Sequence, residues 1–323
     1  MSKRQHQQAP VDSRALQSAL VVGAFGRHCL IETDDGQRLI AHPRGKKNQA
    51  VVGDRVLWQA TGDEGSIERL QERRNLFYRQ DEVRTKSFAA NLDRVLILIA
   101  AEPEFSESQL ARALVAAEAE KTTPVIALNK SDLAEPFAQA WHRLAPYRAM
   151  GYQVLPLSLN PRSVLSGDDG VPALCAQLRG HTTLVLGPSG SGKSTLINRL
   201  LPHAQVETGE ISQALNSGKH TTTNTRWYWV PELDRAGQRT ALIDSPGFQE
   251  FGLNHIEPTQ LAQCMPDLRQ YLGQCRFYNC THLHEPGCAV LAEVASEEKA
   301  GTISARRHRI YAQLFEELSQ QRW

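Results

Sequence analysis

One short stretch, residues 187–194, limits what this chain can fold into more than any other part of the sequence. It reads Gly-Pro-Ser-Gly-Ser-Gly-Lys-Ser, with an apolar run at 182–186 before it and a helical pattern at 195–201 after it. Strand, glycine-rich loop and helix therefore follow one another as in a phosphate-binding loop. Glycines let backbone N–H groups surround a pyrophosphate, and the N-terminus of the helix adds positive potential. A glycine-rich surface turn is the alternative, and the flanking strand and helix argue against it.

This loop supplies most of the expected nucleotide contacts. We expect binding by Gly187, Pro188, Ser189, Gly190, Ser191, Gly192, Lys193, Ser194 and Thr195. Lys193 should reach the outer phosphates and take part in catalysis, and the hydroxyl of Ser194 should bind Mg²⁺. The loop by itself does not separate ATPases, kinases and GTPases.

A second motif, Asn-Lys-Ser-Asp at residues 129–132, points to guanine. It directly follows a strand predicted at 124–128, at the edge of a sheet where ligand-binding loops belong. The carboxylate of Asp132 can accept hydrogen bonds from guanine N1–H and N2–H₂, a pair of donors that adenine lacks. The predicted base site consists of Asn129, Lys130, Ser131, Asp132 and Ser158.

A third motif, Asp-Ser-Pro-Gly at residues 244–247, ends another predicted strand. In this position Asp244 can meet Mg²⁺ through water, while the N–H of Gly247 faces the γ-phosphate. The guanine motif comes before the phosphate loop, whereas ordinary GTPases have it last. A site made of loops at one edge of a sheet depends only on where the loops lie in space. The order therefore predicts a circularly permuted α/β GTPase domain with about six strands. Within it, Ser106 should cap one helix, and a single further helix is expected at 137–150.

The segment at residues 218–224 is rich in threonine and is typical of a switch that orders around γ-phosphate and Mg²⁺. We expect Thr222 to bind Mg²⁺, with Thr221 as the alternative, although an ordinary threonine-rich loop would explain the segment alone. Phe248 stands where many GTPases place the glutamine that orients the attacking water, so intrinsic hydrolysis should be slow. His220 is the predicted catalytic substitute for that glutamine, against the alternative of an ordinary loop histidine.

The carboxyl-terminal part contains three cysteines and a histidine that can surround a metal ion. They are Cys275, Cys280, His282 and Cys288. A Cys₃His set is a closed, structural type of Zn²⁺ site, and buried thiols are the alternative explanation. His284 is a spare candidate ligand. The chain should end in a helix at 306–318, whose three arginines are either phosphate contacts or part of a solvated face.

The amino-terminal part reads as an all-β domain. Short apolar runs alternate with turn signals between residues 19 and 70, including an Asp-Gly pair at 35–36. A five-stranded, OB-type oligonucleotide-binding barrel is the natural candidate at this size. Its loop at 43–47 and its arginines could follow a phosphate backbone, with solvated charges as the alternative for each residue.

The net charge, the apolar runs and the cysteine content limit the partners and the compartment that we expect. The formal net charge of +1 implies no particular partner. The amino end lacks the apolar core of a secretory signal, and no apolar run is long enough to span a membrane. We therefore expect a cytoplasmic, monomeric protein with no membrane partner. In that reducing compartment, the six cysteines should be thiols or metal ligands.

A length of 323 residues exceeds one ordinary core, so we expect a multi-domain protein. The expected parts are a flexible arm at 1–17, an OB-type RNA-binding barrel at 18–80, the permuted P-loop GTPase domain at 81–255 and a small helical zinc-binding domain at 256–323.

Taken together, these motifs resemble the circularly permuted, small-ribosomal-subunit-dependent GTPases of bacteria, the RsgA type. The resemblance covers nearly the whole chain and rests on the joint order of the barrel, the nucleotide motifs and the cysteine cluster. It implies a GTPase that binds GTP, GDP and 16S rRNA, acts late in maturation of the 30S subunit and leaves after GTP hydrolysis. It agrees with one structural Zn²⁺ ion and with Mg²⁺ bound beside GTP. The rival function is an RNA-binding scaffold in which nucleotide is only structural; an ATP-dependent kinase is a weaker rival because of Asp132.

Overall fold

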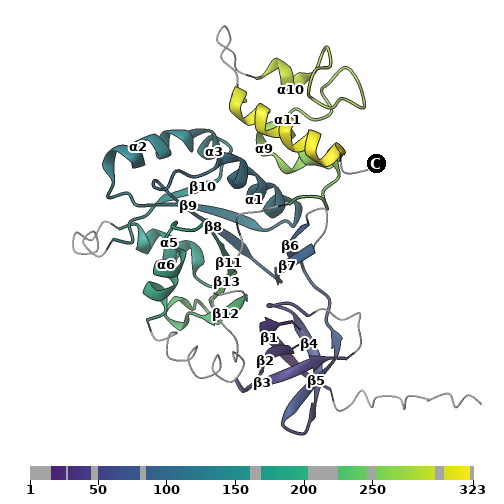
Figure 1. Ribbon diagram of the computed structural model, residues 1–323, viewed down its shortest axis with the longest axis vertical. Coiled ribbons are helices and arrows are strands. Elements are labelled where there is room, and N and C mark those ends of the chain that lie inside the picture. The colour runs from purple at the N-terminus through teal and green to yellow at the C-terminus, as the bar shows by residue number, and fades with distance from the viewer. Residues whose placement is uncertain are drawn as a thin grey trace, which may run out of the picture. The chain divides into compact units, whose positions relative to one another are not determined.

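The structure, a computed structural model, describes residues 16–26, 28–44, 50–80, 85–160, 169–202, 225–245, 248, 252–294 and 302–320. The chain divides into two compact units, Met1–Arg73 and Arg74–Trp323, and each is described by itself (Figure 1). Most of the expected arm and the whole expected switch, residues 218–224, lie outside the described residues. The domain limits expected at 80 and 255 stay predictions.

The smaller unit is a five-stranded barrel. Its strands are β1 (Gln17–Phe25), β2 (His28–Thr33), β3 (Arg38–Pro43), β4 (Arg55–Thr61) and β5 (Glu64–Leu70). They are ordered β1-β2-β3-β5-β4, and β1 also pairs with β4, which closes the sheet. Strands β3 and β5 run parallel, whereas the other neighbours are antiparallel. This topology confirms the predicted OB-type barrel.

Alternate side chains of these strands fill the interior of the barrel. Ile31, Val56 and Ile67 are fully buried in one apolar cluster. Asp54, which precedes β4, is only 1% exposed and is held by Arg73, with Nε to Oδ1 at 2.6 Å and Nη2 to Oδ2 at 2.8 Å. A buried carboxylate needs such a paired cation, so Arg73 stabilises the barrel itself.

The larger unit is built on six strands in the order β10-β9-β8-β11-β13-β12. They are β8 (Arg94–Ala100), β9 (Thr123–Asn129), β10 (Gln153–Pro156), β11 (Thr182–Leu186), β12 (Arg226–Trp229) and β13 (Ala241–Asp244); the 3-10 turn η2 (Pro231–Leu233) follows β12. Five strands run parallel, and β12 is antiparallel to β13. Residues 95–99 are all at most 1% exposed, as expected for a strand covered on both faces.

Helices cover both faces of this sheet. They are α1 (Glu107–Ala119), α2 (Ala134–Arg143), α3 (Ala145–Ala149), α5 (Val171–Leu178) and α6 (Lys193–Leu200). Figure 1 shows α1, α2 and α3 on one side of the strands and α5 and α6 on the other. Leu96 of β8 lies in one buried cluster with Leu174 of α5 and Leu196 of α6. As predicted, Ser106 caps α1, because its Oγ accepts from Gln109 N at 3.3 Å.

Three local features differ from the predicted pattern. The single helix expected at 137–150 is divided between α2 and α3, because Pro146 cannot continue a helix and stands instead in the first turn of α3. The apolar run at 51–52 forms a turn, in which Val51 N donates to Asp54 Oδ2 at 2.8 Å. An unpredicted hairpin of β6 (Leu76–Gln80) and β7 (Thr85–Ala90) forms a second sheet in the larger unit.

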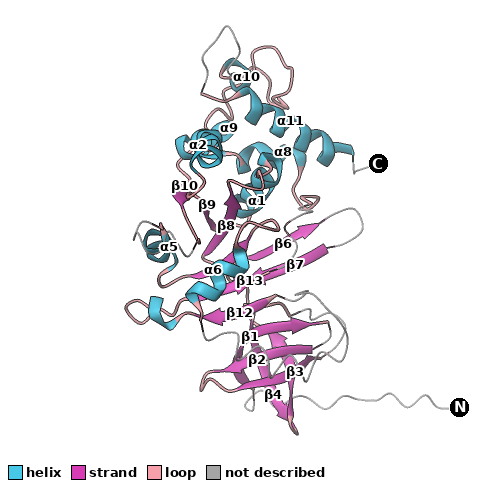
Figure 2. Cartoon of the chain, turned by 60° about the vertical axis from the view of Figure 1, so that its left-hand side comes forward, coloured by secondary structure: helices cyan, strands magenta, loops and turns pink. Residues whose placement is uncertain are grey.

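The carboxyl-terminal part is small and helical, as predicted. It contains α8 (Pro258–Leu261), the 3-10 turn η3 (Ala262–Cys264), α9 (Pro266–Arg269), α10 (Ala289–Ala292) and α11 (Ala305–Gln320). Figure 2 shows α9, α10 and α11 lying together, apart from the strands of the sheet. The apolar face of α11 buries Ile310, Leu314 and Leu318. None of the helices in the described ranges has the length and apolar character needed to cross a membrane.

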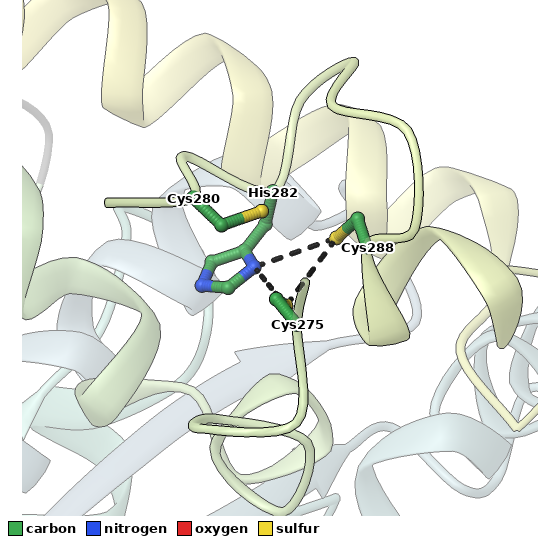
Figure 3. Close-up of side chains that lie close together, drawn as sticks. All are labelled: Cys275, Cys280, His282 and Cys288. Carbon is green, nitrogen blue, oxygen red and sulfur yellow. Dashed lines mark hydrogen bonds between the residues drawn. The ribbon is translucent and has the colours of Figure 1, made fainter. Parts of the chain in front are cut away.

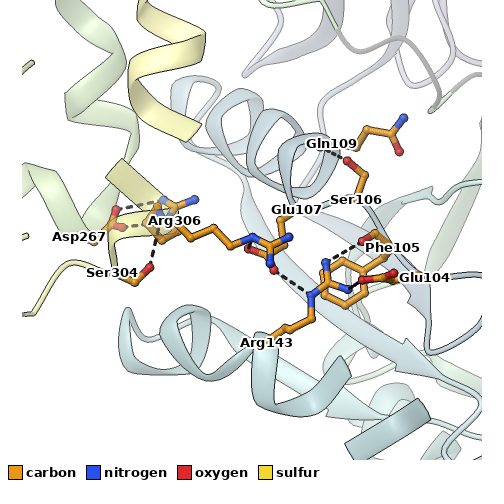
Figure 4. A network of polar contacts seen from close by, with 10 residues as sticks. Glu104, Phe105, Ser106, Glu107, Gln109, Arg143, Asp267, Ser304 and Arg306 are labelled. Atoms are coloured by element: carbon orange, nitrogen blue, oxygen red, sulfur yellow. Dashed lines mark hydrogen bonds and ion pairs between the residues drawn. The ribbon is translucent and has the colours of Figure 1, made fainter. Parts of the chain in front are cut away.

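Ion pairs fasten α11 to the rest of the larger unit (Figure 4). Arg307 is 3% exposed and donates to both oxygens of Asp267, with Nε to Oδ2 at 2.8 Å and Nη2 to Oδ1 at 3.0 Å. Arg306 Nε lies 3.0 Å from Oε2 of Glu107, the first residue of α1. Arg143 Nε donates to Oε1 of the same carboxylate at 2.9 Å. Two of the three arginines of the predicted helix therefore hold the fold together.

Candidate nucleotide and metal sites

The phosphate loop connects β11 to α6, as the sequence predicts. Helix α6 begins at Lys193, and Gly192 before it has a φ of +98°, a conformation that favours glycine. A Cβ atom at Gly192 would lie 2.3 Å from Asn129 Nδ2, and one at Gly187 would lie 2.5 Å from Leu98 O. Glycine is therefore required where this loop packs against β8 and against the loop at 129–132 after β9, called the base loop below.

Asn129, the last residue of β9, joins the base loop to the phosphate loop. It is 3% exposed, and its Nδ2 donates to Ser191 O at 2.8 Å. Its Oδ1 accepts from Lys130 N at 2.8 Å and from Leu159 N at 3.1 Å. One buried carboxamide thus holds together the loops that follow β9, β10 and β11.

Asp132 has a hydrogen bond on each of its carboxylate oxygens. Ser158 Oγ donates to Oδ1 at 2.8 Å, and Asn160 Nδ2 donates to Oδ2 at 2.9 Å. The bond from Asn160, together with that from Ser158, lowers the pKa of Asp132 and keeps the carboxyl ionised. Ser158 is a predicted site residue, whereas Asn160 is not. The only sequence signal for Asn160 is its position two residues after Ser158 in the same loop.

The base loop and the phosphate loop line one cavity of about 730 Å³, a size typical of small-molecule and cofactor sites. The predicted residues that line it are Asn129, Lys130, Asp132, Gly187, Pro188, Ser189, Gly190, Gly192, Lys193, Ser194 and Thr195. Leu133, Leu159, Asn160 and Phe248 complete the lining. The predicted residues Ser131, Ser158 and Ser191 do not line the cavity, and Ser158 and Ser191 are each 1% exposed. Two loops that are far apart in the sequence therefore share one site.

The phosphate end of the cavity is marked by an ion pair between Lys193 Nζ and Asp244 Oδ1. Asp244 ends β13, which lies next to β11 in the sheet, and this neighbourhood brings it to the phosphate loop. Phe248 is 3% exposed and offers no hydrogen bond to the cavity through its side chain. The predicted residues His220, Thr221, Thr222 and Gly247 lie outside the described part of the chain.

The four candidate metal ligands come together in the carboxyl-terminal part (Figure 3). They are Cys275, Cys280, His282 and Cys288, and their ligand atoms lie within 4.8 Å of one another. The Sγ atoms of Cys275 and Cys288 are 3.8 Å apart, and His282 Nδ1 lies 3.5 Å from each. In a tetrahedral site with metal–sulfur bonds of about 2.3 Å and metal–nitrogen bonds of about 2.0 Å, the corresponding edges are about 3.8 Å and about 3.5 Å. Three of the four ligand atoms therefore have the spacing of a tetrahedral metal centre.

Backbone donors support the sulfur atoms of this cluster. Ala289 N donates to Cys275 Sγ at 3.4 Å, and Leu291 N donates to Cys288 Sγ at 3.4 Å. Hydrogen bonds to a charged acceptor favour its charged form, which is the thiolate form that binds metals. The start of α10 is thereby positioned directly against the cluster.

The loop between His282 and Cys288 is held by a carboxylate and by α11. Thr281 N donates to Glu285 Oε1 at 2.7 Å. Burial opposes ionisation of Glu285, but hydrogen bonds from the Thr281 side chain and backbone lower its pKa well below the usual range. From α11, Tyr311 Oη donates to Thr281 O at 2.7 Å, and His308 Nε2 lies 2.8 Å from His282 O. Sequence reasoning missed these supporting residues.

The barrel arginines that were candidates for nucleic-acid contacts are engaged in ion pairs. The pairs are Arg38 with Glu32, Arg44 with Glu68, Arg55 with Asp34 and Arg73 with Asp54. The side chains of Arg55 and Asp34 are 49% and 73% exposed, so this pair contributes little to stability and can exchange for another anion. Arg44 is 47% exposed, but it pairs with a carboxylate that is only 8% exposed, so it also stabilises the barrel. Residues 45–47 of the predicted basic loop at 43–47 lie outside the described residues.

Known proteins match this chain over nearly its whole length. The sequence profile of the RsgA GTPase family matches residues 70–254. A protein of Variovorax paradoxus named "Small ribosomal subunit biogenesis GTPase RsgA" is 67% identical over 315 residues, which are 98% of this chain and 96% of that protein. The crystal structure of YjeQ from Thermotoga maritima is 26% identical, with a TM-score of 0.68 over 94% of this chain and 99% of that one. The structure of YloQ, described as a circularly permuted GTPase, is 24% identical and has the same fold, with a TM-score of 0.67 over 98% of this chain and 99% of that one. By these matches, together with the shared cavity of its base and phosphate loops, the chain belongs to the RsgA GTPase family.

Proposed function

We propose that this protein is a GTPase that acts late in the maturation of the small ribosomal subunit. It binds 16S rRNA on the immature 30S particle and leaves after it hydrolyses GTP to GDP and phosphate. It works as a monomer in the cytoplasm. The name of its Variovorax relative, a small ribosomal subunit biogenesis GTPase, supports this role.

The observation that carries the proposal is the single cavity shared by the base loop and the phosphate loop. At one end, the ionised Asp132 offers acceptors for guanine N1–H and N2–H₂, a pair of donors that adenine does not have. At the other end, backbone N–H groups and Lys193 suit a chain of phosphates. A guanosine triphosphate satisfies both ends at once.

In the proposed reaction, the chain positions the triphosphate and stabilises the charge that develops on the γ-phosphoryl group. Lys193 neutralises the outer phosphates, and the loop N–H groups hold them in place. Ser194, Thr222 and Asp244 would hold Mg²⁺. The proximity of Asp244 to Lys193 and the place of Ser194 in the cavity lining support this assignment. Mg²⁺, when bound, supplies positive charge to the β- and γ-phosphates.

Intrinsic hydrolysis is expected to be slow, because Phe248 lines the cavity where a water-orienting glutamine would otherwise stand. We propose that His220 orients the attacking water once the ribosomal particle is bound. His220→Ala should lower the turnover stimulated by 30S particles about tenfold or more while changing GTP affinity less than about twofold. Steady-state hydrolysis with and without particles measures this, and an unchanged stimulated turnover would exclude His220.

We propose that the Cys₃His cluster holds one Zn²⁺ ion with a structural role. The ligand spacing of 3.5 to 3.8 Å among Cys275, His282 and Cys288 supports a tetrahedral ion. A set of three cysteines and one histidine leaves no coordination position open for chemistry. The ion would keep the loops of this part in place against α10 and α11.

Exposed aromatic side chains next to the Cys₃His cluster support the proposed contact with rRNA. Between the first two cysteines, Phe277 is 42% exposed and Tyr278 is fully exposed, and they are the large apolar side chains exposed among the described residues. Arg276 lies beside them, with its guanidinium carbon 5.5 Å from the Phe277 ring centroid. Exposed aromatic rings next to an arginine suit stacking on unpaired bases and contact with phosphate.

The decisive experiment compares GTP hydrolysis by the purified protein alone and with immature 30S particles. The proposed function predicts a large stimulation by the particles, followed by release of the GDP form. An RNA-binding scaffold with structural nucleotide would bind the particles equally in the GTP and GDP states and show no stimulation. Competition binding with ATP serves as the control for nucleotide identity.

A further inference from the structure

The carboxylate of Asp132 is prepared on both oxygens before any base is bound. An ionised carboxylate has about four acceptor positions, two on each oxygen. Ser158 occupies one position on Oδ1, and Asn160 occupies one on Oδ2. Neither of these two bonds fills both acceptor positions of its oxygen, and Asp132 lines the cavity. Two donors, one for each oxygen, are what the edge of guanine supplies.

The two hydrogen bonds have different surroundings. Ser158 is 1% exposed, and its backbone N donates to Asp169 O at 2.9 Å, so it forms a fixed support behind the loop. Asn160 is partly exposed and lines the cavity itself. The preceding residue, Leu159, is anchored through its N–H to Asn129 Oδ1 at 3.1 Å, which brings Asn160 to the edge of Asp132.

The second hydrogen bond limits rotation of the carboxylate. The torsion that turns an aspartate carboxylate about its Cβ–Cγ bond is soft, and a single bond at Oδ1 still lets Oδ2 swing. A bond at Oδ2 as well fixes the plane of the group, so that the acceptor positions left on the two oxygens keep one orientation. Two parallel hydrogen bonds to guanine need both positions aligned, whereas one hydrogen bond needs only one.

We propose that Asn160 is a positioning residue for nucleotide specificity, which holds Asp132 in the orientation that reads both guanine N1–H and N2–H₂. This inference rests on the proposed GTPase function, because it concerns the same cavity. In this role Asn160 differs from the residues of the phosphate loop. Asn160 affects recognition of the base and not hydrolysis of the bound triphosphate.

The test compares Asn160→Ala with the unaltered protein in binding of GTP and of inosine triphosphate, which keeps N1–H and lacks the N2 amino group. GTP affinity should fall about five- to tenfold, because the two-bond contact is loosened. Affinity for inosine triphosphate should fall about twofold or less, so the preference for GTP shrinks at least about threefold. The kcat at saturating GTP and the thermal midpoint should not change.

The matched control is Asn198→Ala, which removes an exposed asparagine of α6 that does not line the cavity. It should leave both affinities unchanged. Equal losses for GTP and inosine triphosphate in Asn160→Ala, or no loss for GTP, would overturn the inference. Failure of the unaltered protein to bind GTP would contradict the proposed function instead, so the two failures are distinguishable.

Discussion

The nucleotide cavity takes its lining from loops spread between residues 129 and 248, whereas the four candidate metal ligands all lie between residues 275 and 288. The cavity depends on parallel strands that carry distant loops to one edge of a sheet. The metal cluster takes all four of its candidate ligands from the turns of one short segment. We therefore expect the cavity to be sensitive to changes in the sheet and the cluster to loss of any one ligand.

Helix α11 limits the independence of these two sites. His308 Nε2 of α11 lies 2.8 Å from His282 O in the segment 275–288, called the metal loop because it carries the four candidate ligands. On the same helix, Arg306 Nε lies 3.0 Å from Glu107 Oε2 at the start of α1. One helix thus contacts both the metal loop and the α/β part. Substitutions can show how strongly the two sites are coupled through it.

The largest effect is expected from loss of a metal ligand. Cys288 is 4% exposed and lies 3.5 Å from His282 Nδ1. Cys288→Ser should remove the bound Zn²⁺ and the folding free energy that the ion supplies, which is about 10 kcal/mol or more in isolated zinc-binding peptides. Metal analysis and hydrogen exchange of α10 and α11 measure the loss, and Cys175→Ser, outside the cluster, is the control. Full retention of zinc would contradict the assignment of Cys288.

The same variant shows whether the nucleotide cavity is independent of the metal cluster. If the two sites are independent, GTP affinity of Cys288→Ser stays within about twofold of the unaltered protein, a change below about 0.4 kcal/mol. A larger fall in GTP affinity would show that the two sites are coupled, with the contact of Arg306 in α11 with Glu107 as the connection between them. Titration with GTP at one ionic strength separates these outcomes.

A smaller but still large effect is expected at the buried pair of α11. Asp267 and Arg307 are 5% and 3% exposed, so Asp267→Ala leaves a buried cation without its partner. Such a change costs about 3–5 kcal/mol, and hydrogen exchange should show it as easier opening of α11. The control is Glu317→Ala, which breaks the more exposed pair with Arg112 and should cost less than about 1 kcal/mol. Similar effects of the two substitutions would show that burial does not determine the strength of these pairs.

At the nucleotide cavity, Lys193→Ala should reduce GTP turnover about a hundredfold, equivalent to about 2.7 kcal/mol of transition-state stabilisation. The variant removes the positive charge that lies beside Asp244 at the phosphate end. Zinc content should stay at one ion per chain, because no metal ligand is touched. Arg179→Ala, an exposed cation at the end of α5, controls for loss of charge alone. A turnover that survives the loss of Lys193 would exclude the proposed catalytic role of this side chain.

The smallest effect concerns His255, which lies on the segment between the two sites. Burial lowers its pKa from 6.5 to about 4, and its ring centroid lies 4.2 Å from that of Tyr78. The unfolded chain therefore binds a proton first as the pH falls. The stability due to neutral His255 is present above about pH 6.5 and is lost toward pH 4.

At pH 5 this loss amounts to at most about 2 kcal/mol, because one pKa unit corresponds to about 1.4 kcal/mol. Urea unfolding of the unaltered protein and of His255→Phe at pH 7 and pH 5 measures it. The phenylalanine variant should lose less stability than the unaltered protein between these values. Because acid also weakens metal binding in both proteins, only the difference between them reports on His255. An equal loss in both would show that His255 does not titrate as its burial predicts.

Much of the nucleotide site could be predicted from the sequence because its motifs have fixed local geometry. The strand, glycine loop and helix around Lys193 need only their own residues to adopt this shape, and Gly192 has the positive φ that such a loop requires. The metal cluster was predictable for the same reason, since the ligands of a structural zinc site follow short spacings. Asn160 was not predictable in this way, because its role depends on how closely the loop after β10 approaches Asp132.

The arginines show where sequence reasoning is insufficient. A pattern of basic residues does not reveal whether each one meets a carboxylate or remains available to phosphate. Arg73 and Arg307 belong to buried pairs with Asp54 and Asp267, partners that are separated from them in the sequence. The division of the helix at 137–150 had a visible cause in Pro146, whereas the hairpin of β6 and β7 carries only weak strand signals.

The ion pair of Lys193 with Asp244 gives the cavity a form of charge selectivity. Each of the two groups neutralises the other when no ligand is present. An anion that arrives alone draws Lys193 away and leaves Asp244 without a counter-charge. A triphosphate that arrives with its own divalent cation would provide a new partner for both groups in one event. We therefore expect the cavity to bind free inorganic phosphate weakly and to favour a nucleotide that arrives together with its metal.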